Sequence, residues 1–233
     1  MAPQICLNQT LADFHDKRAT TMPADQLKAN VDQRRLLAET ADRSLFVKRG
    51  DSVQAFTLAE VDEGDLTLDV LLENGPLVLI FFRFAKSPTC NVTLSYYNRY
   101  LAPDLARIGA TLVGVSPQAP QNLREIKEQQ ALDFRIATDR NNVLGRRFGI
   151  LYWLDEPSRR VASGSVAQLE ATTEAGKWEL PMPAAIVIDR NHTVQFSDVS
   201  PDWLVRTEPA DIIAAVQDLV DLPAAQQRMQ VLV

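Results

Sequence analysis

Cysteine and histidine are both scarce in this sequence. Its 233 residues include only two cysteines, Cys6 and Cys90, and two histidines, His15 and His192. Two cysteines so far apart do not suggest a disulfide framework. The four residues also lack the spacing of metal ligands, so we expect no metal site. Nothing else in the sequence requires a cofactor, and we expect none.

Long apolar runs and long basic runs are absent as well. No apolar segment approaches the roughly 18 to 20 residues that are needed to span a bilayer. Residues 1–10 lack the basic start and the apolar stretch of a signal peptide. The net charge of −6 argues against a surface that binds nucleic acid. We therefore expect a globular, cytoplasmic protein that binds neither membranes nor nucleic acids.

The most informative segment that is present covers residues 76–90. An apolar run of strand length begins at Pro76 and ends in a short polar turn, and Cys90 follows where a helical pattern begins. Because backbone N–H groups at a helix N-terminus favour an anion, a cysteine at this position can have a lowered pKa and be reactive as a thiolate. The alternative is a buried cysteine that only packs, and its position alone leaves both roles open.

The chain is predicted to contain a helical N-terminal arm over residues 1–46, one domain over 47–222 and a C-terminal tail over 223–233. The arm has two amphipathic helices separated near Pro23, with an apolar stripe along the second at Leu27, Val31, Leu36 and Leu37. We expect the arm to pack on the main domain or on a second subunit. Residues 151–179 have a weak pattern and are interpreted as an insertion or lid.

Strands alternate with helices through the predicted domain, which indicates βαβ units around a largely parallel sheet. The pattern predicts strands over residues 54–58, 76–84, 110–116 and 134–137, and a β-hairpin over 184–196. It predicts helices over residues 67–72, 90–108, 120–130, 142–150 and 209–222. A turn is expected over residues 62–65.

Several separated segments resemble the peroxiredoxin-like branch of the alkyl hydroperoxide reductase and thiol-specific antioxidant superfamily. Residues 50–58 look like the family's Gly-Asp-x-x-Pro-x-Phe-x-Leu motif, with Gln54 in place of the proline. The other similar segments are residues 75–91, 109–118, 179–189 and 199–209. The resemblance implies an α/β, thioredoxin-like fold with a central mixed sheet flanked by helices, plus the helical N-terminal arm.

The same resemblance assigns roles to residues around the thiol. Cys90 falls in register with the peroxidatic cysteine of Pro-x-x-x-Thr-x-x-Cys, Ser87 occupies the place of the threonine, and Arg83 that of the proline. Ser87 also stands where this branch has the first cysteine of Cys-x-x-Cys. A dithiol cycle inside this motif is therefore excluded, because a hydroxyl is a far poorer nucleophile than a thiol. Pro88 and Thr89 are expected to line the substrate pocket.

The resemblance fails at the arginine that peroxiredoxins place before their Phe-Ile-Ile-Asp strand. Pro183 stands there instead. Met182 and Pro183 resemble the cis-proline pair of the thioredoxin fold, so we expect a cis bond between them and a place for both in the pocket beside the thiol. Arg83 is the candidate replacement for the missing arginine, and Arg146 and Arg147 compete with it.

The leading hypothesis implied by the resemblance is a one-cysteine thiol peroxidase that reduces hydrogen peroxide or alkyl hydroperoxides at Cys90. An external thiol would reduce the oxidised enzyme, or Cys6 if the arm reaches the site. One alternative is a diverged protein that acts as a redox sensor or binding module. Another is a specialised enzyme whose insertion, with Tyr152, Trp153 and Trp178 at its ends, lines a larger pocket, although core packing would also explain these aromatic residues. The apolar arm and tail suggest a homodimer.

Overall fold

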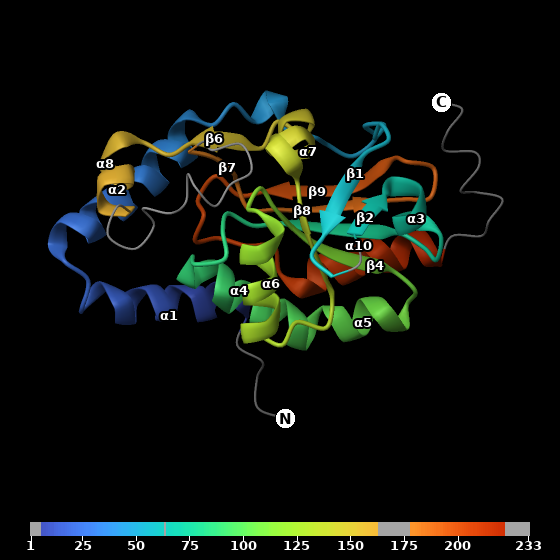
Figure 1. The fold of residues 1–233 in the computed structure, drawn as a ribbon, viewed down its shortest axis with the longest axis horizontal. Coiled ribbons are helices and arrows are strands. Elements are labelled where there is room, and N and C mark those ends of the chain that lie inside the picture. The colour runs from blue at the N-terminus through green and yellow to red at the C-terminus, as the bar shows by residue number, and fades with distance from the viewer. Residues whose placement is uncertain (1–5, 63, 163–177, 222–233) are drawn as a thin grey trace.

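A seven-stranded mixed sheet forms the centre of the protein (Figure 1). The computed structural model describes residues 6–62, 64–162 and 178–221. The strands lie in the order β2-β1-β5-β4-β3-β8-β9. Their bounds are β1 Thr57–Glu60, β2 Gly64–Thr67, β3 Leu77–Phe81, β4 Thr111–Ser116, β5 Arg135–Thr138, β8 Ala184–Ile188 and β9 Val194–Val199.

Helices cover both faces of this sheet. In Figure 1, α1, α4, α5, α6 and α10 lie on one side of it and α7 lies on the other. Two 3-10 turns, Arg43–Leu45 and Arg140–Asn142, complete the described helical segments. The α-helices are α1 Leu7–Ala19, α2 Ala24–Thr40, α3 Leu68–Leu72, α4 Pro88–Tyr100, α5 Ala102–Arg107, α6 Pro120–Gln129, α7 Val143–Arg147, α8 Glu156–Ala162 and α10 Pro209–Val220.

The inner strands are apolar because both of their faces are covered. All five residues of β3 and all five of β8 are buried. β3 pairs in parallel with β4 and β4 pairs in parallel with β5, whereas β8 runs antiparallel to β3 and β9 antiparallel to β8. Strands that are buried on both faces have continuous apolar runs in their sequence, which explains why the sequence pattern predicts these strands close to their observed positions. The predicted mixed sheet and β-hairpin are confirmed. The expectation of a largely parallel sheet is wrong, because β1 pairs antiparallel with both β2 and β5, so that only the β3–β4 and β4–β5 pairs of the described strands are parallel.

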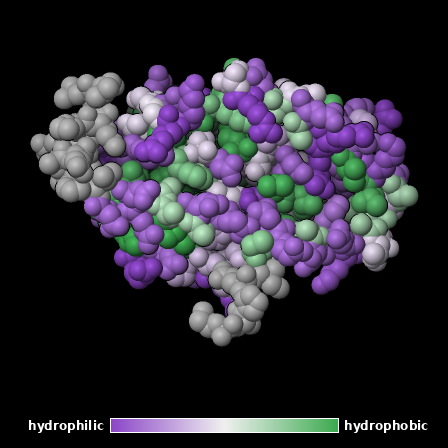
Figure 2. Space-filling view, turned by 180° about the vertical axis from the view of Figure 1, so that it is seen from behind, coloured by the Kyte–Doolittle hydropathy of each residue, from purple (hydrophilic) through white to green (hydrophobic). Residues whose placement is uncertain are grey.

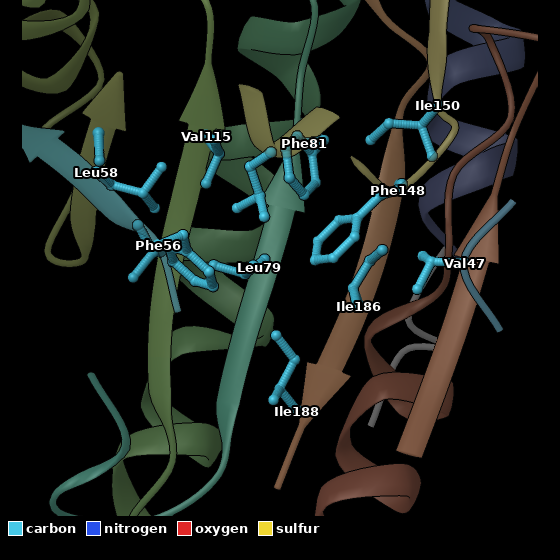
Figure 3. Packing of buried hydrophobic residues seen from close by; sticks show 14 of the residues in the cluster. Val47, Phe56, Leu58, Leu79, Phe81, Val115, Phe148, Ile150, Ile186 and Ile188 are labelled. Atoms are coloured by element: carbon cyan, nitrogen blue, oxygen red, sulfur yellow. The ribbon is translucent and has the colours of Figure 1, made fainter. Parts of the chain in front are cut away.

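Alternate residues of β3 supply two separate apolar clusters, one on each face of the sheet. Leu79 and Phe81 face the cluster that contains Phe148 of the α7 end, and the Phe81 and Phe148 ring centroids are 5.9 Å apart (Figure 3). Ile80 and Phe82 belong to the opposite cluster, which also contains Cys90. The thiol therefore lies on the face of the sheet that α1, α4, α5 and α10 cover.

The helical arm packs on the main domain. Leu7 and Leu11 of α1 are fully buried in the same cluster as Cys90, and α1 contacts α4 while α2 contacts α8. The expected stripe along α2 is wrong in part, since Val31 and Leu36 are 44% and 48% exposed. This helix instead buries smaller or polar side chains, among them Gln33.

Other boundaries also differ from the sequence-based expectation. The strand expected over residues 54–58 runs instead over Thr57–Glu60. The predicted helix over residues 90–108 divides at Leu101, because Pro103 lacks the N–H that a continuous helix needs. The expected turn at 62–65 overlaps the start of β2, an edge strand that buries only Leu66 and therefore has a weak sequence pattern. The ends of the expected insertion form a two-stranded antiparallel sheet of β6 Leu151–Trp153 and β7 Glu179–Pro181. Most of the remaining insertion lies outside the described residues.

One face of the protein is mainly polar on its surface. Figure 2 shows a face on which apolar groups form small, separate patches among hydrophilic residues. None of the helices within the described ranges is both long and apolar enough to cross a bilayer.

Gly149 follows α7 and packs against the backbone of the arm at Leu45, so this position should tolerate no side chain. Its φ is +68°, and an added Cβ would overlap the backbone oxygen of Leu45. We expect Gly149→Ala to lower the free energy of unfolding by about 3 kcal/mol, since strain and overpacking combine. Gly64→Ala is the matched control, because its φ is +92° but nothing lies within 4 Å of an added Cβ. Equal losses for the two variants in urea unfolding would contradict a tight contact at Leu45.

Candidate functional site

Cys90 lies in the first turn of α4, as predicted. Ser87 is the N-cap of this helix and Pro88 is its first residue, where a missing N–H costs nothing. The Cys90 side chain is fully buried. The strand β3 and the turn after it thus bring the thiol to a helix N-terminus, where backbone N–H groups stabilise an anion.

Hydroxyl-bearing residues lie before and after Cys90 in the first turns of α4. The Ser87 side chain donates a hydrogen bond that favours the Cys90 thiolate. Its Oγ also lies 3.1 Å from the Thr89 Oγ1, and both residues are buried. The Thr93 hydroxyl donates to the Thr89 carbonyl over 2.8 Å, which fixes the first turn of α4. Pro88 is exposed at the start of the helix.

Arg83 points into the protein rather than into solvent, with 6% of its surface exposed. Its guanidinium donates to the Tyr152 hydroxyl over 3.3 Å and to the Ser87 Oγ over 3.4 Å. The guanidinium carbon lies 4.1 Å from the centroid of a Trp203 ring, a distance typical of a cation–π contact. The Arg83 Nε has no hydrogen-bond partner within the described part of the chain. Of the three candidate arginines, this one is brought to the thiol.

A second arginine at the site, Arg206, was not among the predicted candidates. It lies in the loop between β9 and α10, is 6% exposed, and interacts with Cys90. Its Nη1 donates to the carbonyls of Trp203 and Val205, the latter over 2.8 Å. Its Nη2 has no hydrogen-bond partner among the described residues. The loop therefore holds the guanidinium in place and leaves one of its nitrogens free.

These charges determine the ionisation of the thiol. Burial alone would raise the pKa of Cys90, but the charges of Arg206 and Arg83 and the hydrogen bond from Ser87 act in the opposite direction. Together they hold the pKa of Cys90 below its ordinary value. In the described ranges neither guanidinium forms an ion pair with a carboxylate. The Cys90 thiolate is thus the anion that can balance this buried positive charge.

The loop that carries Arg206 is tied to α4 and to the sheet. The Tyr97 hydroxyl of α4 donates to the Thr207 carbonyl over 2.6 Å. The Thr207 hydroxyl donates to Asp198 over 2.8 Å, and the Ser200 N–H donates to the Pro183 carbonyl over 2.8 Å. These bonds place the loop across the end of the sheet at which the thiol lies.

The expected cis bond between Met182 and Pro183 is wrong, because every described peptide bond is trans. The trans form is the favoured isomer before proline, and it is compatible here with the hydrogen bond from the Met182 N–H to the Ile150 carbonyl over 2.7 Å. Met182 packs in the cluster on the other face of the sheet from Cys90. Tyr152, through its bond to Arg83, reaches the site instead.

The competing candidates lie elsewhere. Arg146 forms a two-bond ion pair with Glu179, at 2.9 and 2.6 Å, and Arg147 donates to the Ala55 carbonyl over 3.0 Å. Trp153 is 57% exposed, and Trp178 is partly buried against the apolar cluster opposite the thiol. These contacts fit structural roles.

Comparison with known proteins identifies the family. The sequence model of the AhpC/TSA family matches residues 49–197. The chain belongs to the AhpC/TSA family. A protein of Mycobacterium tuberculosis (strain CDC 1551 / Oshkosh) named "Putative peroxiredoxin MT1643" is 30% identical over 104 residues, which cover 45% of this chain and 67% of that protein.

Solved structures agree with this AhpC/TSA assignment at the level of the fold. The peroxidoxin BcpB from Mycobacterium tuberculosis has a TM-score of 0.58 at 23% identity, over 74% of this chain and 98% of that one. A peroxiredoxin-like protein from Aquifex aeolicus has a TM-score of 0.57 at 16% identity, over 75% of this chain and 88% of that one. The predicted thioredoxin-like fold is confirmed.

The sequence alone does not show that Arg206 is buried beside the thiol. Arg206 and Trp203 both lie beyond residue 197, at which the AhpC/TSA match ends. A sequence signal for Arg206 was available, since residues 199–209 resemble the peroxiredoxin-like branch and contain this arginine.

In the described part of the chain no three potential metal ligands lie close enough together to form a metal site.

Proposed function

We propose that this AhpC/TSA protein is a thiol peroxidase in which Cys90 reduces hydrogen peroxide or an alkyl hydroperoxide. The observation that carries the proposal is the position of Cys90 at the N-terminus of α4, where it interacts with the buried guanidiniums of Arg83 and Arg206. A thiolate is the nucleophile in this chemistry, and these cations favour the thiolate. Ser87 supplies a hydroxyl at the same sulfur.

The proposed step breaks the O–O bond of the peroxide. The Cys90 thiolate attacks one oxygen, and the S–O bond forms as the O–O bond breaks. The other oxygen leaves with the electron pair and takes a proton, which gives water or an alcohol, and Cys90 becomes a sulfenic acid. The free Nη2 of Arg206 and the free Nε of Arg83 are donors suited to the negative charge that develops on the leaving oxygen.

An external thiol is the proposed reductant. It would attack the sulfenic acid to form a mixed disulfide and water, and a second thiol would then release Cys90 and form the external disulfide. Ser87 cannot serve as an internal thiol. A cytoplasmic location, in which small thiols are kept reduced, would supply the reductant.

An intact-protein mass spectrum after one equivalent of hydrogen peroxide tests both the reactive residue and the reductant. We expect the mass of one added oxygen atom, and a dimedone-type reagent should label Cys90 as the sulfenic acid. Cys6 is exposed at the start of α1 and no described residue forms a disulfide with it. Cys6→Ala should therefore form and retain the same labelled species. A Cys6–Cys90 disulfide in the wild type would show that Cys6, rather than an external thiol, resolves the intermediate.

Complete burial of Cys90 favours a second candidate function, a redox sensor or binding module. Susceptibility to oxidation follows exposure as well as thiolate character, and this sulfur has no exposed surface. A stopped-flow measurement separates the two candidates. A peroxidase should react with peroxide much faster than free cysteine does, and a rate no higher than that of free cysteine would favour the sensor or binding role.

A homodimer is the proposed assembly. Apolar side chains of the arm remain exposed at Val31, Leu36 and Leu45, which supports an interface there. The apolar tail that was also expected to contribute lies outside the described residues. Sedimentation at micromolar concentration should give a dimer, and a monomer would contradict this proposal.

A further inference from the structure

The helical arm and the loop that carries Arg206 both lie outside the segment that matches the AhpC/TSA family, yet they bind each other closely. The Asn8 side chain of α1 forms two hydrogen bonds with the backbone of Arg206. Its Nδ2 donates to the Arg206 carbonyl over 2.7 Å, and its Oδ1 accepts from the Arg206 N–H over 2.8 Å. One side chain of the arm thus satisfies both backbone groups of Arg206.

The first turn of α1 is fixed to the same loop by Glu208. The Leu7 and Asn8 N–H groups each donate to the Glu208 carboxylate over 2.9 Å. Free N–H groups at a helix N-terminus need such acceptors, and the carboxylate also complements the helix dipole. Glu208 is itself the N-cap residue of α10. The start of α1 and the start of α10 therefore meet at the residue that lies two positions after Arg206.

The second helix of the arm holds the other end of the loop. Gln33 is 4% exposed, and its Oε1 accepts from the Trp203 indole N–H over 3.1 Å. Arg34 forms a two-bond ion pair with Asp202, at 2.6 and 2.8 Å. Asp202 also accepts from the Leu204 N–H over 3.0 Å. Paired bonds of this kind fix orientation as well as distance.

These contacts lead directly to the groups around the thiol. Trp203 is held by Gln33 and contacts the Arg83 guanidinium, and its carbonyl accepts from the Arg206 guanidinium. The positions of both site arginines therefore depend on a loop whose two ends are held by α1 and α2. Cys90 itself makes its polar contacts with Ser87, Arg83 and Arg206.

We propose that the helical arm is part of the reactive site, with Asn8, Gln33 and Arg34 as positioning residues that hold Arg206 and Trp203 around Cys90. None of the three is proposed to touch the reacting atoms. The consequence for peroxide reduction rests on the proposed function. The consequence for the reactivity of the Cys90 thiol does not, because thiolate formation precedes any peroxide chemistry.

Alkylation of Cys90 by iodoacetamide across a range of pH values tests the proposal without using peroxide. The full chain with Cys6→Ala provides a single reactive thiol. In this background, Asn8→Ala and Arg34→Ala should each slow alkylation near neutral pH by about tenfold, since small displacements of charged groups have effects of this order or larger. The rate should recover at higher pH, because the variants raise the pH at which the thiolate forms. Arg34→Lys, which keeps the charge, should restore part of the rate.

Arg35→Ala is the matched control. Arg35 is the next residue of α2, but within the described ranges its ion pair is with Asp32 on the surface of the same helix, and its loss should leave the pH profile unchanged. Asn8 is half-buried at the start of α1, so Asn8→Ala should fold, and its pH profile tests the positioning role if Arg34→Ala fails to fold. Folded Asn8→Ala and Arg34→Ala variants with the wild-type pH profile would overturn the positioning role. A wild type that alkylates readily but consumes no peroxide would overturn only the proposed function.

Discussion

Replacing Cys90 with alanine is expected to reduce peroxide consumption by this protein to the rate of buffer alone. Cys90 is the thiol that the structure places at a helix N-terminus beside two buried guanidiniums. No other described thiol shares this setting, since Cys6 is exposed. The measurement is the loss of hydrogen peroxide and of an alkyl hydroperoxide in the presence of excess dithiothreitol, with wild-type protein and Cys90→Ala compared at equal concentration.

Two controls separate the loss of the nucleophile from other effects. Cys6→Ala should consume peroxide at the wild-type rate. Cys90→Ala removes a single sulfur atom but also the thiolate that balances the buried charges of Arg83 and Arg206, so we expect a folded variant with a lowered free energy of unfolding, and thermal unfolding measures this. Residual consumption by Cys90→Ala above the buffer rate would show that another group does the chemistry.

The sequence predicts the local part of the site well because its parts are close together in the chain. An apolar strand, a polar turn and a helix start fix the direction in which Cys90 points. Ser87 and Arg83 precede the thiol by only a few residues, so the register of the motif brings them near it. The structure shows these contacts at Ser87 and Arg83.

The distant part of the site could not be predicted in the same way. Whether an arginine is buried or solvated depends on tertiary contacts, and for Arg206 these come from α1 and from the carbonyls of its own loop. The expected cis bond between Met182 and Pro183 was wrong for a related reason, since it was transferred from the thioredoxin fold and not from contacts within this chain. The bond is trans, and Met182 packs in the apolar cluster on the opposite face of the sheet from Cys90. Short edge strands such as β2 bury too little apolar surface to show a pattern.

Removing the charge of Arg206 is expected to have the second largest effect on reactivity. Arg206→Met keeps an apolar stem of similar length and removes a cation that lowers the pKa of Cys90. The thiolate should then form only at higher pH, so the peroxide rate near pH 7 falls and recovers in part as the pH rises. Loss of a donor to the leaving oxygen adds to this, and together we expect a decrease of about a hundredfold or more.

Stability distinguishes this effect from a folding defect. Arg206 is a buried cation without a carboxylate partner among the described residues, so its neutral replacement removes the cost of burying the charge. It also removes the hydrogen bonds to the Trp203 and Val205 carbonyls, so we expect a folded variant with a moderate decrease in the free energy of unfolding. Arg147→Met is the control, since Arg147 lies away from the thiol and, in the part of the chain that the structure describes, donates its side-chain hydrogen bond to the Ala55 carbonyl. A slow but folded Arg206→Met, beside a fully active Arg147→Met, would establish that Arg206 acts on the thiol. An Arg206→Met variant with the wild-type rate and pH profile would contradict that role and leave Arg83 as the cation at Cys90.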